Sequence, residues 1–273
     1  MRIVTDSTSY LPPEVIRQYE IDVVPLEITL GDLTFREGEI SNREYYARLR
    51  TEKIFPTTSQ PPVGDFMEAF KRYGPGESYL CLVISELLSG TKQSAETAAS
   101  LLPDYDITVM DSRSTATGLG FLVIRAAQLA GQGLSKDEII QELAGIRSAL
   151  KVVFVVDNLE YLVRGGRLSR TSGVLGNLLQ VKPILGLVDG RIEPLDKVRT
   201  KARAVQRIVQ ELEQRYEQGL VSHVSVVHVD QEAEGRELAE RVQGFFKGPI
   251  LFSEAGPTIG SHTGPGTLGL IYY

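Results

Sequence analysis

Four short motifs place hydroxyl, imidazole and guanidinium groups on segments that are rich in glycine or proline. They are PTTSQPP at residues 56–62, SELLSGT at 85–91, RGGRLSR at 164–170 and GPTIGSHTGPG at 256–266. Such groups together suit the recognition of a carboxylate or a phosphate through hydrogen bonds. The fold must therefore bring these four segments together for the chemistry to operate.

The histidine of the last motif, His262, is one of three in the chain. His223 and His228 lie in or beside a predicted strand, which favours structural or surface roles for them. Glycine permits positive φ and a close approach of other groups, and proline fixes the path of the backbone. We therefore interpret residues 256–266 as a loop that presents the ring of His262 to a ligand.

The other three motifs each have a structural alternative. The hydroxyls of residues 57–59 precede a helix predicted to begin near Val63, where Ser and Thr commonly cap the first turn. Ser89 stands where the next helix opens, and free N–H groups at such an end favour an anion; capping by Ser89 is compatible with that role. Arg167 is, by default, a solvated loop residue.

The sequence disfavours a metal site, a hydrolase nucleophile, a nucleotide-phosphate site and a nucleic-acid partner. No pair of His or Cys residues has the spacing of metal ligands, so we expect no metal site. The sequence contains no G-x-S-x-G motif and no G-x-x-x-x-G-K-[ST] motif, and residues 256–266 are not expected to open a helix after a strand. A net charge of −6 argues against a nucleic-acid partner. The single cysteine, Cys81, lies in an apolar run and is expected to be a buried thiol.

The elements that position these motifs follow from hydrophobic periodicity. Short apolar runs in the first half, MRIVTDS, YLCLVIS and ITVMDS, alternate with helical patterns, which indicates a parallel sheet covered on both faces. The helical patterns are EVIRQY, VGDFMEAFKRY, TKQSAETAASLL and TGLGFLVIRAAQLA. Ligands of such sheets bind at the carboxyl ends of the strands. The side chains expected on or near that edge are Asp6, Ser7, Ser89, Asp111 and Ser112.

The second half has a different pattern. A helix near residues 135–149 is followed by the strand KVVFVVDN, a hairpin around Asp189-Gly190, and the strands HVSVVHV, ILFSEA and TLGLIYY, with helices at 199–218 and 231–245. The predicted fold class is α/β: a domain at 1–150 with a parallel sheet flanked by helices, and an α+β domain at 151–273 with a mixed, partly antiparallel sheet. No apolar run has membrane-spanning length and no signal peptide is visible, so we expect a cytoplasmic protein.

Taken together, the motifs resemble the DegV family, which includes the FakB subunits of bacterial fatty acid kinase. They occur in the order VTDST, TSQP, LSGTKQSA, VMDSRS, LEYLVRGGRLS and IGSHTGPG from one end of the chain to the other. The resemblance implies a cytoplasmic bacterial protein of phospholipid metabolism that needs no cofactor. It implies two α/β domains with a long-chain fatty acid buried in a cleft at their junction, and a separate kinase catalytic subunit that converts the acid to an acyl phosphate.

Position by position, the resemblance assigns the carboxylate to Thr58, Ser89 and His262, and Arg167 to supporting the histidine or facing the incoming phosphate. The same motifs add Ser59, Gly90 and Ser261 to the expected ligand-binding set. Segments 121–130, 159–162 and 174–179 could line a tunnel for the acyl chain. This sequence has Glu86 where relatives often carry Ser, which adds a negative charge near the expected head-group site, and Ser261 where Thr is common.

Two functions remain open at this point. The first is a lipid-binding carrier without catalytic residues of its own. Such a carrier is compatible with transient contact with a membrane surface. The second is an acyl transferase or esterase in which a Ser or Thr is paired with His262. A nucleophile of that kind needs a third group that orients its base, and Arg167 accepts no proton. We therefore favour the carrier.

Overall fold

A four-stranded parallel sheet organises the first half of the chain in the computed structural model, which describes residues 1–52, 54–168 and 181–273. Its strand order is β2-β1-β6-β7. The strands are β1 (Arg2–Asp6), β2 (Asp22–Val24), β6 (Ser78–Val83) and β7 (Asp106–Asp111). The three long strands were predicted from their apolar runs, whereas β2 is too short to show a pattern.

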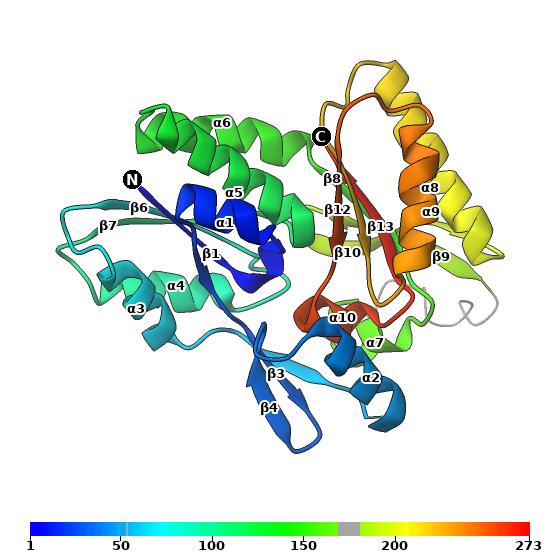
Figure 1. Cartoon of the computed structure of the whole chain (residues 1–273), viewed down its shortest axis with the longest axis horizontal. Coiled ribbons are helices and arrows are strands. Elements are labelled where there is room, and N and C mark those ends of the chain that lie inside the picture. Colours follow the sequence, from blue (N-terminus) through cyan, green and yellow to red (C-terminus); the bar gives the residue numbers. More distant parts are fainter. Residues whose placement is uncertain (53, 169–180) are drawn as a thin grey trace.

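Helices cover both faces of this parallel sheet (Figure 1). Alternate residues of a strand point to opposite faces, and in β6 Leu80 and Leu82 pack on one side while Tyr79 and Cys81 pack on the other. The first side carries α1 (Pro13–Tyr19), α5 (Ala116–Gly131) and α6 (Lys136–Ala149), and the second carries α3 (Val63–Lys71) and α4 (Thr91–Ser100). This arrangement confirms the predicted α/β fold class.

A six-stranded mixed sheet organises the second half, with the order β10-β9-β8-β13-β11-β12. Its strands are β8 (Lys151–Val155), β9 (Lys182–Val188), β10 (Arg191–Val198), β11 (Val224–His228), β12 (Ile250–Glu254) and β13 (Leu268–Tyr272). Only β11 and β12 run parallel; the other pairs are antiparallel. The segment TLGLIYY therefore lies in the middle of the sheet, and α8 (Lys201–Glu217) and α9 (Glu232–Gln243) cover one face.

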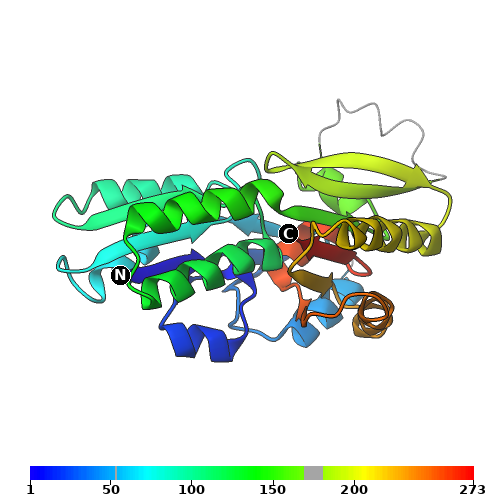
Figure 2. The ribbon, with the colours of Figure 1, turned by 90° about the horizontal axis from the view of Figure 1, so that it is seen from above.

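Figure 2 shows these two sheets at opposite ends of the long axis of the molecule. The predicted division at residue 150 falls between α6 and β8. However, one part of the first half packs against the second. It consists of a three-stranded sheet of β3 (Glu27–Leu30), β4 (Leu33–Arg36) and β5 (Thr57–Ser59), together with α2 (Asn42–Glu52). In α2 the Tyr46 hydroxyl donates to the carbonyl oxygen of Ala255 at 2.8 Å.

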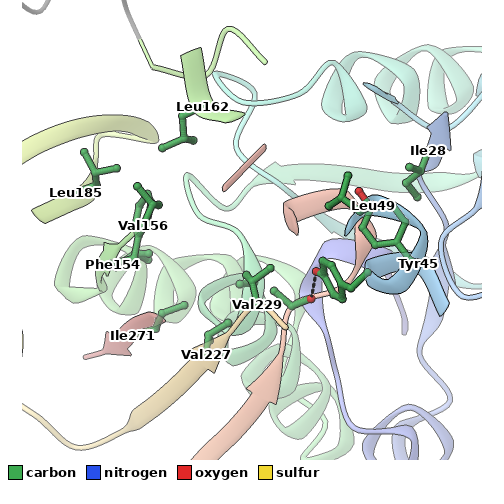
Figure 3. Close-up of a cluster of buried hydrophobic side chains, with 14 of the residues drawn as sticks. Ile28, Tyr45, Leu49, Phe154, Val156, Leu162, Leu185, Val227, Val229 and Ile271 are labelled. Carbon is green, nitrogen blue, oxygen red and sulfur yellow. Dashed lines mark hydrogen bonds between the residues drawn. The ribbon is translucent and has the colours of Figure 1, made fainter. Parts of the chain in front are cut away.

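These contacts build a buried cluster between the second sheet and α2. Figure 3 shows side chains of the second sheet, among them Phe154 and Val227, on the opposite side of this cluster from Tyr45 and Leu49 of α2. The other face of the second sheet packs on α8 and α9 instead. The cluster is where the two halves of the chain meet.

The structure excludes one structural alternative and corrects one sequence interpretation. Residues 57–59 form β5 rather than a helix cap, because they pair with β3, and α3 begins after Pro62 without a side-chain capping bond. Residues 256–266 are not only a loop: α10 (Pro257–Thr263) follows β12 directly. Proline suits the first position of a helix, and Gly260 packs so closely that a Cβ there would lie 2.1 Å from the Tyr46 hydroxyl. These small residues give α10 no apolar periodicity.

Candidate functional site

A cavity lies at the junction of the two halves. The second sheet gives it an apolar wall of Val152, Phe154, Leu187, Ile192, Val227, Gly269 and Ile271. The first half contributes Leu26, Thr58, Ile84, Leu88, Ser89, Thr115 and Ala116, and α10 and its flanks contribute Ala255, Thr258, Ile259, His262, Thr263 and Thr267. The expected tunnel segment at 174–179 lies outside the described residues.

Thr58 and His262 meet at this cavity from positions far apart in the sequence. Thr58 lies in β5, where it pairs with Ile28, and His262 lies in the last turn of α10. The Thr58 hydroxyl oxygen is 2.7 Å from Nε2 of the ring. The geometry therefore brings together a hydroxyl and an imidazole that the sequence placed in separate motifs.

The second ring nitrogen of His262, Nδ1, is buried and has no hydrogen-bond partner within the described part of the chain. It lies against Gly165, where a Cβ would come within 2.3 Å of Nδ1. A buried N–H without an acceptor is costly. We therefore assign the proton of the neutral ring to Nε2, which donates to Thr58 and leaves the Thr58 hydroxyl hydrogen free to donate into the cavity.

Burial and, to a smaller extent, the nearby Arg167 guanidinium lower the pKa of His262 from 6.5 to about 3. The ring is consequently neutral at physiological pH. It contributes hydrogen bonding to the site and no charge.

Arg167 is the only charged side chain among the described residues that border the cavity. It follows α7 (Glu160–Arg164) and is half-buried. Its Nε donates to the Leu88 carbonyl oxygen at 3.0 Å and its Nη1 to that of Gly165 at 2.5 Å. Burial lowers the pKa of this guanidinium. Arg167 is thus a fixed, partly desolvated cation and not a solvated loop residue.

Ser89 borders the cavity just before α4. Its hydroxyl oxygen is 2.8 Å from that of Thr91, and Gly90 occupies the N-cap position without a side-chain capping bond. Gly90 lies against the side chain of Gln60, since a Cβ there would be 2.0 Å from Oε1 of Gln60. The Gln60 amide also donates to the Ser94 hydroxyl at 3.2 Å. Gln60 therefore links the segment of Thr58 to the segment of Ser89 and to α4.

The remaining residues of the expected ligand-binding set lie outside the cavity wall. The Ser261 hydroxyl is buried, donates to the Pro257 carbonyl oxygen at 2.7 Å and lies 2.8 Å from the Tyr45 hydroxyl oxygen. Ser59 is exposed at the end of β5. Glu86 is also exposed, and its carboxylate is paired with Lys92 at 2.6 Å, which lowers its pKa. The added negative charge is therefore partnered on the surface.

Of the acidic and hydroxyl groups expected at the edge of the parallel sheet, Asp6, Asp111 and Ser112 bind backbone groups there. Asp6 is fully buried and accepts from the amide of Ile84 at 2.7 Å, a residue that borders the cavity. Burial raises the pKa of Asp6 to about 6. Asp111 accepts from the amide of Arg113 at 2.9 Å, and the Ser112 hydroxyl donates to the Ser114 carbonyl oxygen at 3.1 Å. These groups shape the loops around the cavity.

Sequence reasoning missed Glu37, whose carboxylate joins its own segment to two others. It accepts from the hydroxyls of Ser7 at 2.5 Å and Tyr10 at 3.1 Å, and from the amide and hydroxyl of Thr258 at 2.8 and 2.7 Å. Burial raises its pKa despite these bonds. Glu37 therefore anchors the start of α10, the helix that carries His262. The local sequence FREGE, which contains Glu37, is typical of a solvent-exposed turn.

This arrangement favours an amphiphile with an anionic head. Hydroxyls, a neutral imidazole and one cation meet at one part of an otherwise apolar cavity. Thr58 and His262 are within the distance of a nucleophile and its base, yet no group within the described residues bonds Nδ1, and a pKa of about 3 makes the ring a weak base. The described residues hold no cluster of metal ligands and no helix long and apolar enough to cross a bilayer.

Known proteins resemble this chain over its full length. The family model described as "Uncharacterised protein, DegV family" matches residues 1–273. A fatty-acid-binding DegV family protein from Thermus thermophilus is 36% identical, with a TM-score of 0.88, and the match covers 100% of this chain and 99% of that one. DegV of Bacillus subtilis, described as a fatty acid binding protein, is 33% identical with a TM-score of 0.93 and coverages of 99% and 98%. A stearic-acid-binding protein from Eubacterium ventriosum is 27% identical with a TM-score of 0.90 and coverages of 100% and 98%.

Proposed function

The chain belongs to the DegV family, and from that premise we propose that it binds a long-chain fatty acid in the cavity between its two halves. The observation that carries this proposal is the meeting of Thr58, Ser89, Arg167 and His262 beside an apolar wall. Structural neighbours that are 27–36% identical are described as binding fatty acids. The proposed head-group site is formed by these four side chains.

The chemistry of the two parts of the cavity matches the two parts of a fatty acid. A hydrogen bond to a charged group contributes about 1.5–3 kcal/mol, so the hydroxyls of Thr58 and Ser89 bind a carboxylate more strongly than a neutral head. Arg167 supplies the compensating charge. Each methylene buried against the apolar wall contributes about 0.8 kcal/mol, which favours a long chain.

We propose further that a separate kinase phosphorylates the bound carboxylate, and that this chain is the carrier subunit. Phosphoryl transfer needs metal ions and a cradle of phosphate-binding groups, and the sequence lacks the G-x-x-x-x-G-K-[ST] motif. A carrier of this kind would load its fatty acid by transient contact with a membrane surface. Its location in the cytoplasm is part of the same proposal.

Mass spectrometry of the purified protein tests the binding function. Under native conditions we expect a fatty acid that leaves the protein on denaturation, and extraction should identify it. The variant His262→Ala should retain less of the lipid, while His223→Ala, which alters a histidine remote from the cavity, should retain it fully. An acyl group that stays attached to Thr58 or Ser89 after denaturation would instead establish the acyl transferase.

Acyl phosphate formation with a fatty acid kinase tests the carrier role. A cation near the transferred phosphoryl group stabilises the transition state more than the ground state. The variant Arg167→Ala should therefore reduce acyl phosphate formation more than palmitate affinity. Arg164→Ala is the matched control, because Arg164 is exposed and paired with Glu160 at 2.7 Å. Equal losses in both assays would restrict Arg167 to carboxylate binding.

A further inference from the structure

Gly269 is a glycine in the middle of β13, one of the two central strands of the second sheet, and its backbone does not require glycine. Its φ is not in the left-handed region. A Cβ there would meet Phe154 Cβ at 3.4 Å and the Val153 carbonyl oxygen at 3.5 Å, which are ordinary contacts. Glycine inside a strand costs about 0.5–1 kcal/mol relative to alanine, so its presence here calls for another reason.

A second strand glycine, Gly186 in β9, shows what a packing requirement looks like. A Cβ at that position would lie 2.5 Å from Leu195 Cδ1 and 2.9 Å from the Val152 carbonyl oxygen. Neighbouring atoms therefore exclude any side chain at Gly186. At Gly269 the three nearest atoms all belong to adjacent strands at ordinary distances, and none belongs to the opposite wall of the cavity.

The register of the sheet places Gly269 in the cavity wall. It lies directly between Phe154 of β8 and Val227 of β11, and all three residues border the cavity. The flanking residues Leu268 and Leu270 face the other way, into the core beneath α8 and α9. Figure 3 shows the side chains of Phe154 and Val227 on the cluster side of the sheet. The missing side chain at Gly269 therefore leaves a notch between two apolar side chains.

We propose that the acyl chain lies in the notch between Phe154 and Val227, and that Gly269 sets how long a chain the cavity accepts. A glycine in a strand often marks the close approach of a ligand. The notch provides apolar contacts from the side chains of Phe154 and Val227 on its two sides. This inference rests on the proposed function, since it concerns the ligand of the same cavity.

The test compares decanoate with palmitate in binding titrations of the wild type, Gly269→Ala and Gly269→Val. Filling a packed apolar space costs about 1–3 kcal/mol, so palmitate affinity should fall roughly 5- to 150-fold in Gly269→Val. The fall in palmitate affinity should be smaller in Gly269→Ala than in Gly269→Val. In each variant, decanoate affinity should fall less than palmitate affinity, because the short tail of decanoate has fewer methylenes to place. The palmitate-to-decanoate affinity ratio is the readout, with circular dichroism and Tm recorded for each variant.

Leu270→Val is the matched control, because it changes the same strand on the opposite face. We expect it to lower Tm and leave the ratio unchanged. An unchanged ratio in both Gly269 variants, or equal losses for the two acids, would overturn the inference about Gly269. Failure of the wild type to bind either acid would overturn the proposed function itself, so the two failures are distinguishable. Gly269→Ala keeps the test decisive if the valine variant does not fold.

Discussion

Acidification gives a sharp test of the site because it acts on His262. The pKa of this ring is about 3 in the folded chain, whereas the ordinary value for histidine is 6.5, and burial is the main cause of the decrease. As pH falls below 6.5 the unfolded chain takes up a proton at this ring, and the folded chain does so only near pH 3. The free energy of unfolding should therefore decrease over that range, by at most about 5 kcal/mol from this group.

A bound carboxylate changes this balance by a calculable amount. At about 4 Å from the ring, it would stabilise the imidazolium by about 4 kcal/mol with an effective dielectric constant of about 20. Raising the pKa of His262 from about 3 to neutrality would need about 5 kcal/mol. The ligand should therefore raise the pKa of His262, yet the ring should remain mostly neutral in the complex at pH 7.

The assay is an NMR titration of the imidazole resonances with and without palmitate. The chain has three histidines, and His262→Gln assigns the resonance of interest by its loss. We expect the ligand-free resonance of His262 to keep its neutral position well below pH 6, and the palmitate complex to titrate at a higher pH. A ligand-free midpoint near 6.5, or an imidazolium in the complex at pH 7, would refute the reasoning from burial.

Two further substitutions test the head-group site and the support of α10. Ser89→Ala should reduce palmitate affinity by roughly tenfold or more, measured by calorimetry, because one hydrogen bond to a carboxylate is lost; a lower Tm with unchanged affinity would count against it. Glu37→Gln should reduce the free energy of unfolding by about 1–3 kcal/mol, since the amide cannot accept all the bonds that Glu37 accepts from Ser7, Tyr10 and Thr258. Glu14→Gln, at an exposed position, is the control in denaturant unfolding and should change little.

The long elements could be predicted from the sequence because their periodicity reflects burial. Strands β1, β6 and β7 and the hairpin of β9 and β10 were predicted from apolar runs and turn residues. The elements between residues 20 and 60 were not, because β2 to β5 have three or four residues each and α2 is largely polar. β2 is held by its pairing with β1 in the first sheet, whereas α2 is held by contacts with the second half of the chain, such as the bond of Tyr46 to Ala255.

The candidate site was only partly accessible to sequence reasoning. Motif resemblance placed Thr58, Ser89, Arg167 and His262 at one site, and the structure brings these four to one cavity. The role of Glu37 depends on burial by segments distant in the sequence, which no local pattern shows. Glycines pose the same difficulty: Gly165 makes room for a ring while Gly269 borders the cavity, and their sequence contexts do not distinguish the two.

The most direct measurement is a crystal structure of the protein saturated with palmitate. We expect the carboxylate within hydrogen-bond distance of the Thr58 and Ser89 hydroxyls, near Arg167, with the acyl chain against the wall that contains Phe154. A palmitate bound with its tail at Thr58, or bound only in the separate groove beside Phe121, would contradict the assignment of this cavity as a fatty acid site.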